Sequence, residues 1–241
     1  MTKSQKYNSN TFLFTNNDNL PITPKWFDTS FWGKHETTSN TTSGRGAVQF
    51  LETEYGKFVI RKYRRGGFIS KFVVFRFLCF GLKQSRPFRE LGLLDYMQSK
   101  RLPSPTPIAA LFQRHGISYE ASIMTALIPD AAELFKLMLP ENANDKSWPK
   151  INWQAIGSTI RRFHDTGIDH TDLNCHNIML DKNNKIWLID FDKCSLRQPK
   201  TSWQKSNLAR LKRSLDKEHH KHEEFQFQNT DWQKLLEGYN G

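Results

Sequence analysis

The most constraining feature of this sequence is a pair of polar segments in its second half. The first is His170-Thr-Asp-Leu-Asn-Cys-His-Asn177, and the second is Leu188-Ile-Asp-Phe-Asp192. Residues 178–189 between them have the pattern of a strand, an Asn-Asn turn and a second strand. Such a hairpin would return Asp190 to the side of Asn177. We therefore expect the carboxylates and amides of the two segments to form one site.

The residue types and their spacing indicate the chemistry of this site. They match H-x-D-x-x-x-x-N and D-F-x, with which kinase-like phosphotransferases hold the magnesium of bound ATP and orient an attacking hydroxyl. Asn177 and Asp190 are the predicted Mg²⁺ ligands, because this ion prefers oxygen. Asp172 is predicted to accept the proton of the substrate hydroxyl. His170 belongs to the same catalytic loop, mainly as a hydrogen-bonding buttress and with less weight as a direct acid or base.

Two other interpretations of this segment are weaker. Asp172 and Asn177 could merely cap a turn, as these residue types often do, but a turn alone does not produce both motifs at this separation. A structural metal site of the zinc type fails on spacing. Cys175 and His176 are adjacent, and no C-x-x-C or H-x-x-x-H pattern supplies four ligands.

Two glycines precede the first strand that we expect. Gly44 and Gly46 lead into a strand ending at Leu51, and a second strand spans Lys57–Tyr63. A G-x-G before a strand is most often only a turn. Followed by the other motifs in this order, it predicts a loop that covers the phosphates of ATP.

The cation that would meet these phosphates is expected at the end of the second strand. Arg61 and Lys62 are the two candidates, and they point to opposite faces because a strand has a period of two. Lysine is the more usual residue, but Val59 shares the face of Arg61 and would line an adenine pocket, which slightly favours Arg61. Glu90, at the start of a predicted helix, is the natural ion-pair partner, or else only a favourable charge at a helix N-terminus. The choice between Arg61 and Lys62 stays open.

Strands precede helices along the chain, which predicts an α+β fold. The expected strands lie at 44–51, 57–63, 108–112 and 117–127, and the expected helices at 87–101, 129–139, 148–166 and, in the tail, around 203–215 and 232–239. We expect an N-terminal extension at 1–42, a sheet lobe with one main helix at 43–128, and a reduced helical lobe with the catalytic loop at 129–241. The order of residues 1–35 and the oligomeric state stay open.

The net charge of +11 is less informative than its placement. The window from Tyr55 to Arg89 holds ten Lys or Arg residues and no acidic residue. A face of one sign attracts an anionic partner, such as nucleic acid, anionic lipid or a phosphorylated substrate. No nucleic-acid-binding module is recognised, and nucleic acid would leave Asp172, Asn177 and Asp190 without a role, so we expect no such partner.

The cysteines and the apolar runs indicate a reducing compartment and no membrane span. Three sparse cysteines make no disulfide framework. The Asn-rich N-terminus lacks the apolar segment of a secretory signal. No run of about 20 apolar residues exists. The longest apolar stretch, at 68–82, is interrupted by Lys71 and Arg76.

These motifs resemble those of the kinase-like superfamily and, more closely, those of the 3-deoxy-D-manno-octulosonic acid (Kdo) kinases, which are related to the lipopolysaccharide core heptose kinases. The resemblance covers residues 40–241. It rests on Val59-Ile-Arg-Lys-Tyr-Arg-Arg-Gly-Gly67, Phe88-Arg-Glu-Leu91, Leu102-Pro-Ser-Pro-Thr-Pro-Ile-Ala109, His170–Ile178, Leu188–Lys193 and Asn207-Leu-Ala-Arg-Leu-Lys-Arg-Ser-Leu215.

The resemblance implies a bilobal protein-kinase-like fold that uses ATP and Mg²⁺. The implied reaction is transfer of the γ-phosphate to the 4-hydroxyl of a Kdo sugar on a lipid A precursor, in lipopolysaccharide biosynthesis. The implied place is the cytoplasmic face of the bacterial inner membrane, where the chain would be a peripheral protein on an anionic surface. No obligatory protein partner is indicated.

Departures from the protein-kinase pattern bear on the acceptor. Asp192 replaces the glycine of D-F-G, Thr171 replaces the arginine of H-R-D, and Asn174 replaces a lysine. Only 49 residues follow Asp192, and no A-P-E motif occurs. These losses count against a protein substrate and agree with a sugar. The alternative is a soluble phosphotransferase of the aminoglycoside or choline type, but such enzymes have acidic pockets, whereas the window at 55–89 is basic.

The aromatic part of the basic window has two interpretations. Its phenylalanines could lie at a bilayer interface beside Lys71 and Arg76. They could instead pack as core, as large aromatic side chains usually do. Both interpretations stay open. The residues concerned are Phe68, Phe72, Phe75, Phe77 and Phe80.

Overall fold

The computed structural model describes residues 3–15, 19–32, 48–63, 76–143 and 147–241 of the chain. The chain divides into two compact units. Unit 1 comprises Met1–Tyr96 and Pro105–Leu127, and unit 2 comprises Met97–Ser104 and Ile128–Gly241. Glycines 44 and 46 and the phenylalanines at 68, 72 and 75, which the sequence singled out, lie outside the described residues.

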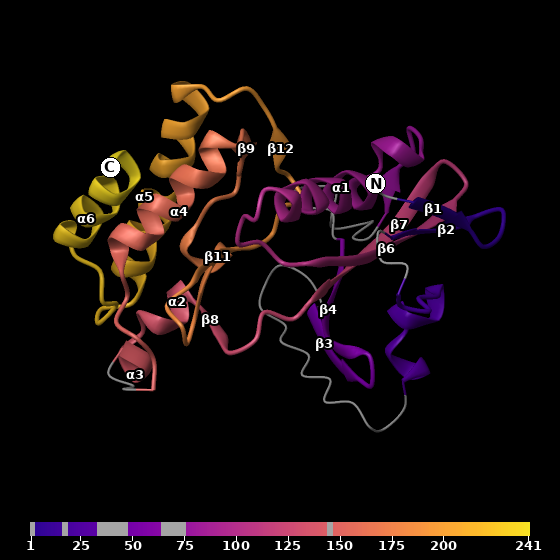
Figure 1. Ribbon diagram of the computed structural model, residues 1–241, viewed down its shortest axis with the longest axis horizontal. Coiled ribbons are helices and arrows are strands. Elements are labelled where there is room, and N and C mark those ends of the chain that lie inside the picture. The colour runs from indigo at the N-terminus through magenta and orange to yellow at the C-terminus, as the bar shows by residue number, and fades with distance from the viewer. Residues whose placement is uncertain (1–2, 16–18, 33–47, 64–75, 144–146) are drawn as a thin grey trace. The chain divides into compact units, whose positions relative to one another are not determined.

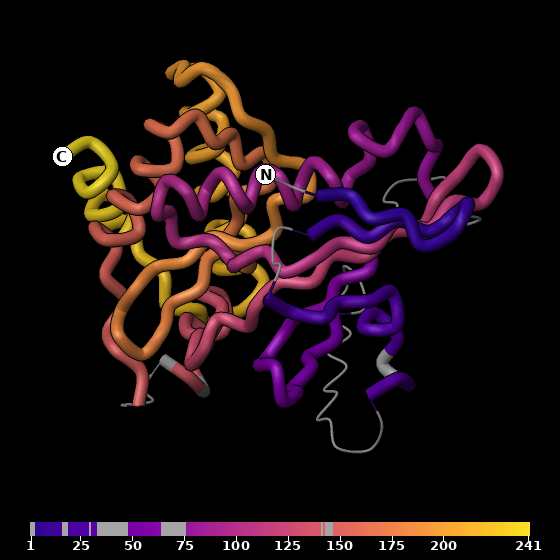
Figure 2. The backbone as a smooth tube through the Cα atoms, turned by 45° about the vertical axis from the view of Figure 1, so that its right-hand side comes forward, coloured from indigo at the N-terminus to yellow at the C-terminus, as the bar shows by residue number. Residues whose placement is uncertain are grey.

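Unit 1 is built on an antiparallel sheet in which the strands follow the order β1-β2-β6-β7-β4-β3, with β5 pairing β7 (Figures 1 and 2). The strands are β1 Lys3–Lys6, β2 Thr11–Thr15, β3 Val48–Thr53, β4 Gly56–Lys62, β5 Phe77–Leu78, β6 Pro107–His115 and β7 Ser118–Ala126. Short 3-10 helices lie at Pro24–Phe27 (η1), Thr29–Phe31 (η2) and Leu82–Gln84 (η5). The predicted strands at 57–63, 108–112 and 117–127 are confirmed, and the first hairpin strand is present as β3.

Helix α1 spans Arg86–Ser99, and all but its last three residues belong to unit 1. Its Leu91 and Leu94 are at most 1% exposed. Phe88 packs edge-on against Phe14 of β2, with ring centroids 5.3 Å apart. The helical spacing of these apolar residues therefore fixes which face of α1 is buried, as the sequence predicted for 87–101.

The N-terminal residues differ from the predicted division at residue 42. Strand β2 pairs with β6, with Thr11 opposite Gln113 and Thr15 opposite Ala109, so residues 3–15 extend the sheet. Leu13 and Phe14 are buried, and Trp26 of η1 joins the same core as Leu13. These residues belong to unit 1 because their apolar side chains complete its core, which composition alone did not reveal.

Unit 2 is mainly helical and carries small antiparallel sheets of order β11-β10-β8 and β12-β9. Its strands are β8 Ala131–Glu133, β9 Ile168–Asp169, β10 Ile178–Asp181, β11 Ile186–Leu188 and β12 Ser195–Leu196. Its helices are α2 Leu134–Leu137, α3 Pro140–Ala143, α4 Trp153–Asp165, η6 Cys175–Asn177, α5 Thr201–Lys221 and α6 Asn229–Asn240. The two predicted tail helices are confirmed as α5 and α6. The overall class is α+β.

Two predicted helices of unit 2 need correction. The helix predicted at 129–139 is wrong in its first half, because Asp130 adopts a positive φ of 48° and β8 then pairs with β10. Only the four residues of α2 are helical. The helix predicted from residue 148 begins at Trp153 instead, because the side chain of Asn152 caps it by accepting from the Ala155 N–H at 3.0 Å.

Helices α4 and α6 pack with their backbones in contact (Figure 1). A Cβ placed on Gly157 of α4 would collide with the carbonyl oxygen of Leu235, and one on Gly238 of α6 would collide with that of Gln154. Glycine at both crossing positions therefore permits this close approach. The pair sets the position of the C-terminal end of α4, after which the catalytic loop begins.

Candidate active site

The catalytic loop predicted from the sequence connects β9 to β10 in unit 2. It enters after Asp169, contains Asp172, and ends in η6 with Asn177. Asn174 caps η6 by accepting from the His176 N–H at 2.9 Å. The loop is thus held at both ends by strands and internally by a cap, which limits the movement of its functional side chains.

Two amides converge on the backbone of Asp172. Asn174 Nδ2 and Asn177 Nδ2 donate to the Asp172 carbonyl oxygen at 2.8 and 3.0 Å. This bond uses the Asn177 amide nitrogen and leaves its amide oxygen available to a ligand. Asn177 is 5% exposed, whereas the Asp172 side chain is 32% exposed. The loop therefore presents a carboxylate to solvent beside an amide oxygen that is suited to a hard cation.

The β10–β11 hairpin brings Asp190 to the same place. Ile178 pairs with Leu188, and the Ile189 N–H donates to the Asn177 carbonyl oxygen at 3.0 Å. The predicted return of Asp190 beside Asn177 is therefore confirmed. Asp190 has a φ of 64°, in the left-handed region that non-glycine residues rarely adopt. Backbone strain of this kind persists where the surroundings impose it, often at functional sites.

His170 supports the loop from within. It is 1% exposed, and its Nε2 lies 3.0 Å from the Ile189 carbonyl oxygen, to which it donates. Burial lowers the pKa of the His170 imidazole, so the ring is neutral near pH 7. Its donation links the catalytic loop to the residue just before Asp190. This geometry favours the buttressing role over direct contact with a substrate.

The face of α5 that follows the catalytic loop was not recognised as part of the site by sequence reasoning. Asn207 accepts from the His170 backbone N–H at 2.9 Å and donates to Asp169 Oδ1 at 3.0 Å. Asp169 is also bound by Arg197 Nη1 at 2.7 Å. These bonds are buried at Asp169 and Asn207, so they fix the start of the loop against the helix.

The same face continues along the loop with one residue per helical turn. Ser214 Oγ accepts from the Cys175 backbone N–H at 3.2 Å, and Glu218 Oε1 lies 3.5 Å from His176 Nε2. Positions 207, 210, 214 and 218 have the spacing of one helical face. Successive turns of α5 therefore contact successive parts of the loop. The spacing is visible in the sequence, but the partners could not be inferred without the docked helix.

Arg210 is the member of this face that meets Asp172. Its Nη1 lies 3.4 Å from Asp172 Oδ1, and the Arg210 side chain is 49% exposed. Arg210 belongs to a segment through which the family resemblance was noted, but no role was assigned to it from the sequence. The contact places a cation directly beside the predicted proton acceptor.

The predicted phosphate cations lie in unit 1 on strand β4. Arg61 Nη2 contacts Glu90 Oε1 at 2.6 Å and Oε2 at 2.7 Å, which confirms the predicted ion pair. Tyr63 donates to Glu90 Oε2 at 2.7 Å. Lys62 points to the other face and pairs with Glu120 at 2.9 Å. The role of Arg61 or Lys62 toward ATP phosphates stays a prediction.

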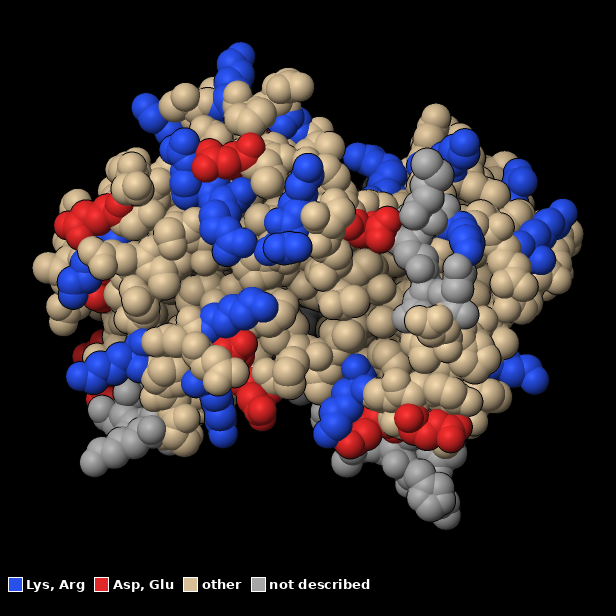
Figure 3. Space-filling model, in the orientation of Figure 1, with Lys and Arg blue, Asp and Glu red and all other residues tan. Residues whose placement is uncertain are grey.

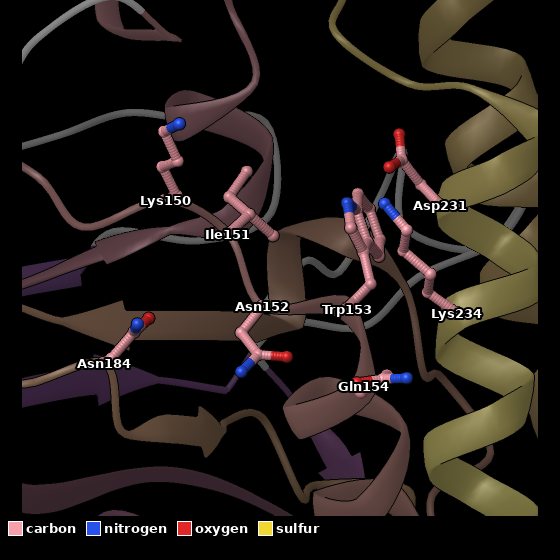
Figure 4. A pocket seen from close by; sticks show the side chains of 8 residues that line it. All are labelled: Lys150, Ile151, Asn152, Trp153, Gln154, Asn184, Asp231 and Lys234. Carbon is pink, nitrogen blue, oxygen red and sulfur yellow. The ribbon is translucent and has the colours of Figure 1, made fainter.

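A pocket of about 370 Å³ in unit 2 contains none of the predicted site residues (Figure 4). It lies at the N-terminal end of α4, around Asn152 and Trp153, with Lys234 of α6 on another side. The catalytic loop follows the opposite end of this helix, about 20 Å away by helix length. We therefore do not assign the pocket to the catalytic site.

The donor set of the loop fits the metal that the sequence predicted. Asn177 and Asp190 offer one amide oxygen and one carboxylate, and Mg²⁺ in phosphate-transferring sites is commonly held by one or two carboxylates together with substrate phosphates. Within the described residues, no cluster of three or more His, Cys, Asp or Glu side chains is arranged to bind a metal. A braced loop with an accessible carboxylate, an amide oxygen and a second carboxylate is the arrangement of a phosphotransferase.

The protein families that this chain resembles also point to a phosphotransferase. Residues 29–239 match the family described as "Lipopolysaccharide kinase (Kdo/WaaP) family". The chain belongs to this family. The matched residues include the catalytic loop, the β10–β11 hairpin and α5.

Several relatives carry the name 3-deoxy-D-manno-octulosonic acid kinase. The protein of Xylella fastidiosa (strain M23) is 41% identical over 189 residues, which cover 78% of this chain and 73% of the relative. That of Photobacterium profundum is 37% identical over 217 residues, 88% and 87% of the two chains. That of Haemophilus influenzae is 38% identical over 237 residues, 95% of each chain.

Proposed function

We propose that this chain transfers the γ-phosphoryl group of ATP to the 4-hydroxyl of a Kdo sugar carried by a lipid A precursor. The observation that carries the proposal is the catalytic loop, where the accessible Asp172 carboxylate, the Asn177 amide oxygen and Asp190 are assembled by hydrogen bonds that the structure describes. Membership of the family and the names of the relatives support the acceptor.

Each loop residue has one task in this proposal. Asp172 accepts a hydrogen bond from the acceptor hydroxyl, orients it toward the phosphorus and takes its proton late in the transfer. Asn177 and Asp190 would hold Mg²⁺ through oxygen. When bound, this ion neutralises charge that develops on the phosphates. His170 keeps the loop in register with the backbone before Asp190.

We assign the two units to the two lobes of a protein-kinase-like fold. In this assignment Arg61, held by Glu90, is the cation that meets the ATP phosphates, and Lys62 is the other candidate. The contact of Arg61 Nη2 with both carboxylate oxygens of Glu90 supports the choice of Arg61, because it holds the end of this side chain in place. Gly44 and Gly46, which lie outside the described residues, stay predicted to contact the phosphates.

The acceptor that we propose is anionic and carries acyl chains. The protein has basic and exposed apolar side chains that would suit such a molecule. Lys and Arg side chains gather on the visible face of unit 2 where α4, α5 and β12 lie (Figure 3). In unit 1, Leu78 and Phe80 are 51% and 76% exposed next to the exposed Arg76. Among the described residues, no helix is both long enough and apolar enough to cross a bilayer. We propose peripheral attachment at the cytoplasmic face of the inner membrane.

The proposal is tested by phosphate transfer from ATP and Mg²⁺ to a Kdo-bearing lipid A precursor in detergent. We expect wild type to transfer phosphate and Asp172→Ala to lose about 10²- to 10⁴-fold in kcat, the usual contribution of a general base. Asp165→Ala is the matched control, because Asp165 is an exposed acid at the end of α4 that pairs only with Arg161 among the described residues. Folded wild type that phosphorylates soluble aminoalcohols or aminoglycosides and not this lipid would contradict the proposed acceptor.

A further inference from the structure

Arg210 differs from the other residues on its face of α5. Asn207 and Glu218 are buried, and Asn207 makes short hydrogen bonds to the loop. Arg210 is half exposed, and its single contact with Asp172 is 3.4 Å long. A guanidinium has five N–H donors in a planar fork. Most of the donor capacity of Arg210 therefore faces solvent beside the residue that would receive the acceptor hydroxyl.

A contribution to the stability of the fold does not explain the placement of Arg210 beside Asp172. An exposed ion pair of this length contributes little to the stability of a fold. Arg210 is positioned instead to contact a group on the acceptor when the acceptor hydroxyl is at Asp172. Arginine is suited to this role because its fork binds a carboxylate or phosphate through two parallel hydrogen bonds.

We propose that Arg210 binds the carboxylate of the acceptor sugar and so presents the sugar hydroxyl to Asp172. This inference rests on the proposed function. An octulosonic acid carries its carboxylate on ring carbon C2, which a single ring carbon separates from the C4 whose hydroxyl is phosphorylated. A ring that places this hydroxyl at Asp172 also places its carboxylate within the neighbourhood of a guanidinium 3.4 Å from that side chain. The lipid A phosphates lie on other sugars of the acceptor, so a Kdo hydroxyl at Asp172 does not fix their distance from Arg210.

The inference makes Arg210 a specificity-determining residue. A neutral sugar would leave the guanidinium without its anion, although its hydroxyl could still reach Asp172. Sugar acids would be preferred over neutral sugars at this site. The selection would occur in unit 2 itself, through two side chains that the α5 helix and the catalytic loop hold together.

The test compares the natural carboxylate acceptor with the same lipid in which the Kdo carboxylate is a carboxamide. For wild type we expect the carboxamide to lower kcat/KM by about 10- to 100-fold, the range of a charge-assisted hydrogen bond. For Arg210→Gln we expect the two acceptors to be used almost equally, at the lower of the two rates. Arg210→Lys should recover part of the preference, because it keeps the charge without the fork.

Lys205→Gln is the matched control for charge on α5. Lys205 is exposed, pairs with no described acid, and lies about 140° around the helix from Arg210. We expect this variant to keep the wild-type preference for the carboxylate. Thermal unfolding of each variant verifies the fold, which the exposed position of Arg210 should leave intact.

The outcomes separate this inference from the proposed function. Wild type that transfers no phosphate to the carboxylate lipid would overturn both. If wild type is active and Arg210→Gln slows transfer equally for the carboxylate and the carboxamide, Arg210 only positions Asp172. That result would overturn the inference and leave the proposed function standing. A third acceptor lacks the lipid A phosphates but keeps the Kdo carboxylate. The inference also fails if Arg210→Gln lowers kcat/KM for the carboxamide lipid but not for this third acceptor, because Arg210 would then bind the phosphates.

Discussion

At the scale of residues, a neutral imidazole in the core of unit 2 couples stability to pH. His164 is buried at the end of α4, and its Nδ1 lies 2.8 Å from the Tyr239 hydroxyl of α6. Burial lowers the pKa of His164 from 6.5 to about 4. The unfolded chain therefore binds a proton at this side chain at a higher pH than the folded chain does. The stabilisation is complete above pH 6.5 and is lost as the pH falls toward 4.

We expect the free energy of unfolding to fall by about 2 kcal/mol between pH 7 and pH 5 through this one group. Burial lowers the pKa of His170 as well, so that residue acts in the same direction. Urea unfolding at the two pH values measures the change. His164→Gln should flatten the dependence, whereas His220→Gln, at an exposed position on α5, should keep it. An equal slope in wild type and His164→Gln would show that His164 is not the group responsible.

At the scale of elements, the crossing of α4 and α6 depends on Gly157 and Gly238. Each glycine faces a backbone carbonyl of the partner helix, which cannot rotate away as a side chain can. Alanine favours a helix by about 1 kcal/mol over glycine. Overpacking costs about 1–3 kcal/mol, and the cost is at the upper end where backbone must move. The destabilisation by overpacking should therefore exceed the stabilisation that alanine gives to the helix.

Gly157→Ala is expected to destabilise unit 2 by about 1–2 kcal/mol, the difference between these terms. Chemical denaturation followed by tryptophan fluorescence gives the value, since Trp153 and Trp203 are buried in this unit. Ser158→Ala, next to it on the exposed side of α4, should stay within about 0.5 kcal/mol of wild type. A Gly157→Ala protein as stable as wild type would show that the helices separate without cost.

The elements that the sequence predicted correctly are those with local signals. The β10–β11 hairpin has its Asn-Asn turn, with Asn184 at a φ of 62°, and α5 has a long apolar period. Strand β8 was missed because its three residues are defined by pairing with β10 and not by their own pattern. The contact between Arg210 and Asp172 was missed for the same reason, since it depends on how α5 docks on the loop.

At the scale of the whole molecule, the two units separate the candidate residues by task. The ion pair of Arg61 and Glu90 lies in unit 1, and the loop with Asp172, Asn177 and the returning Asp190 lies in unit 2. The chain passes from unit 1 to unit 2 between Leu127 and Ile128, next to the predicted boundary at 128, but Met97–Ser104, which the prediction placed in the sheet lobe, belong to unit 2. Residues 3–15 belong to the sheet of unit 1, which the polar composition of the N-terminus did not indicate.

The most direct test of the central claim is the position of phosphate in the product. Wild-type protein would be incubated with ATP, Mg²⁺ and a Kdo-bearing lipid A precursor, and the product analysed by phosphorus and proton NMR. We predict one new phosphate monoester on the 4-hydroxyl of the Kdo sugar, with ADP formed in equal amount. Phosphate on another hydroxyl, or ATP consumed without any phosphorylated lipid, would contradict the account.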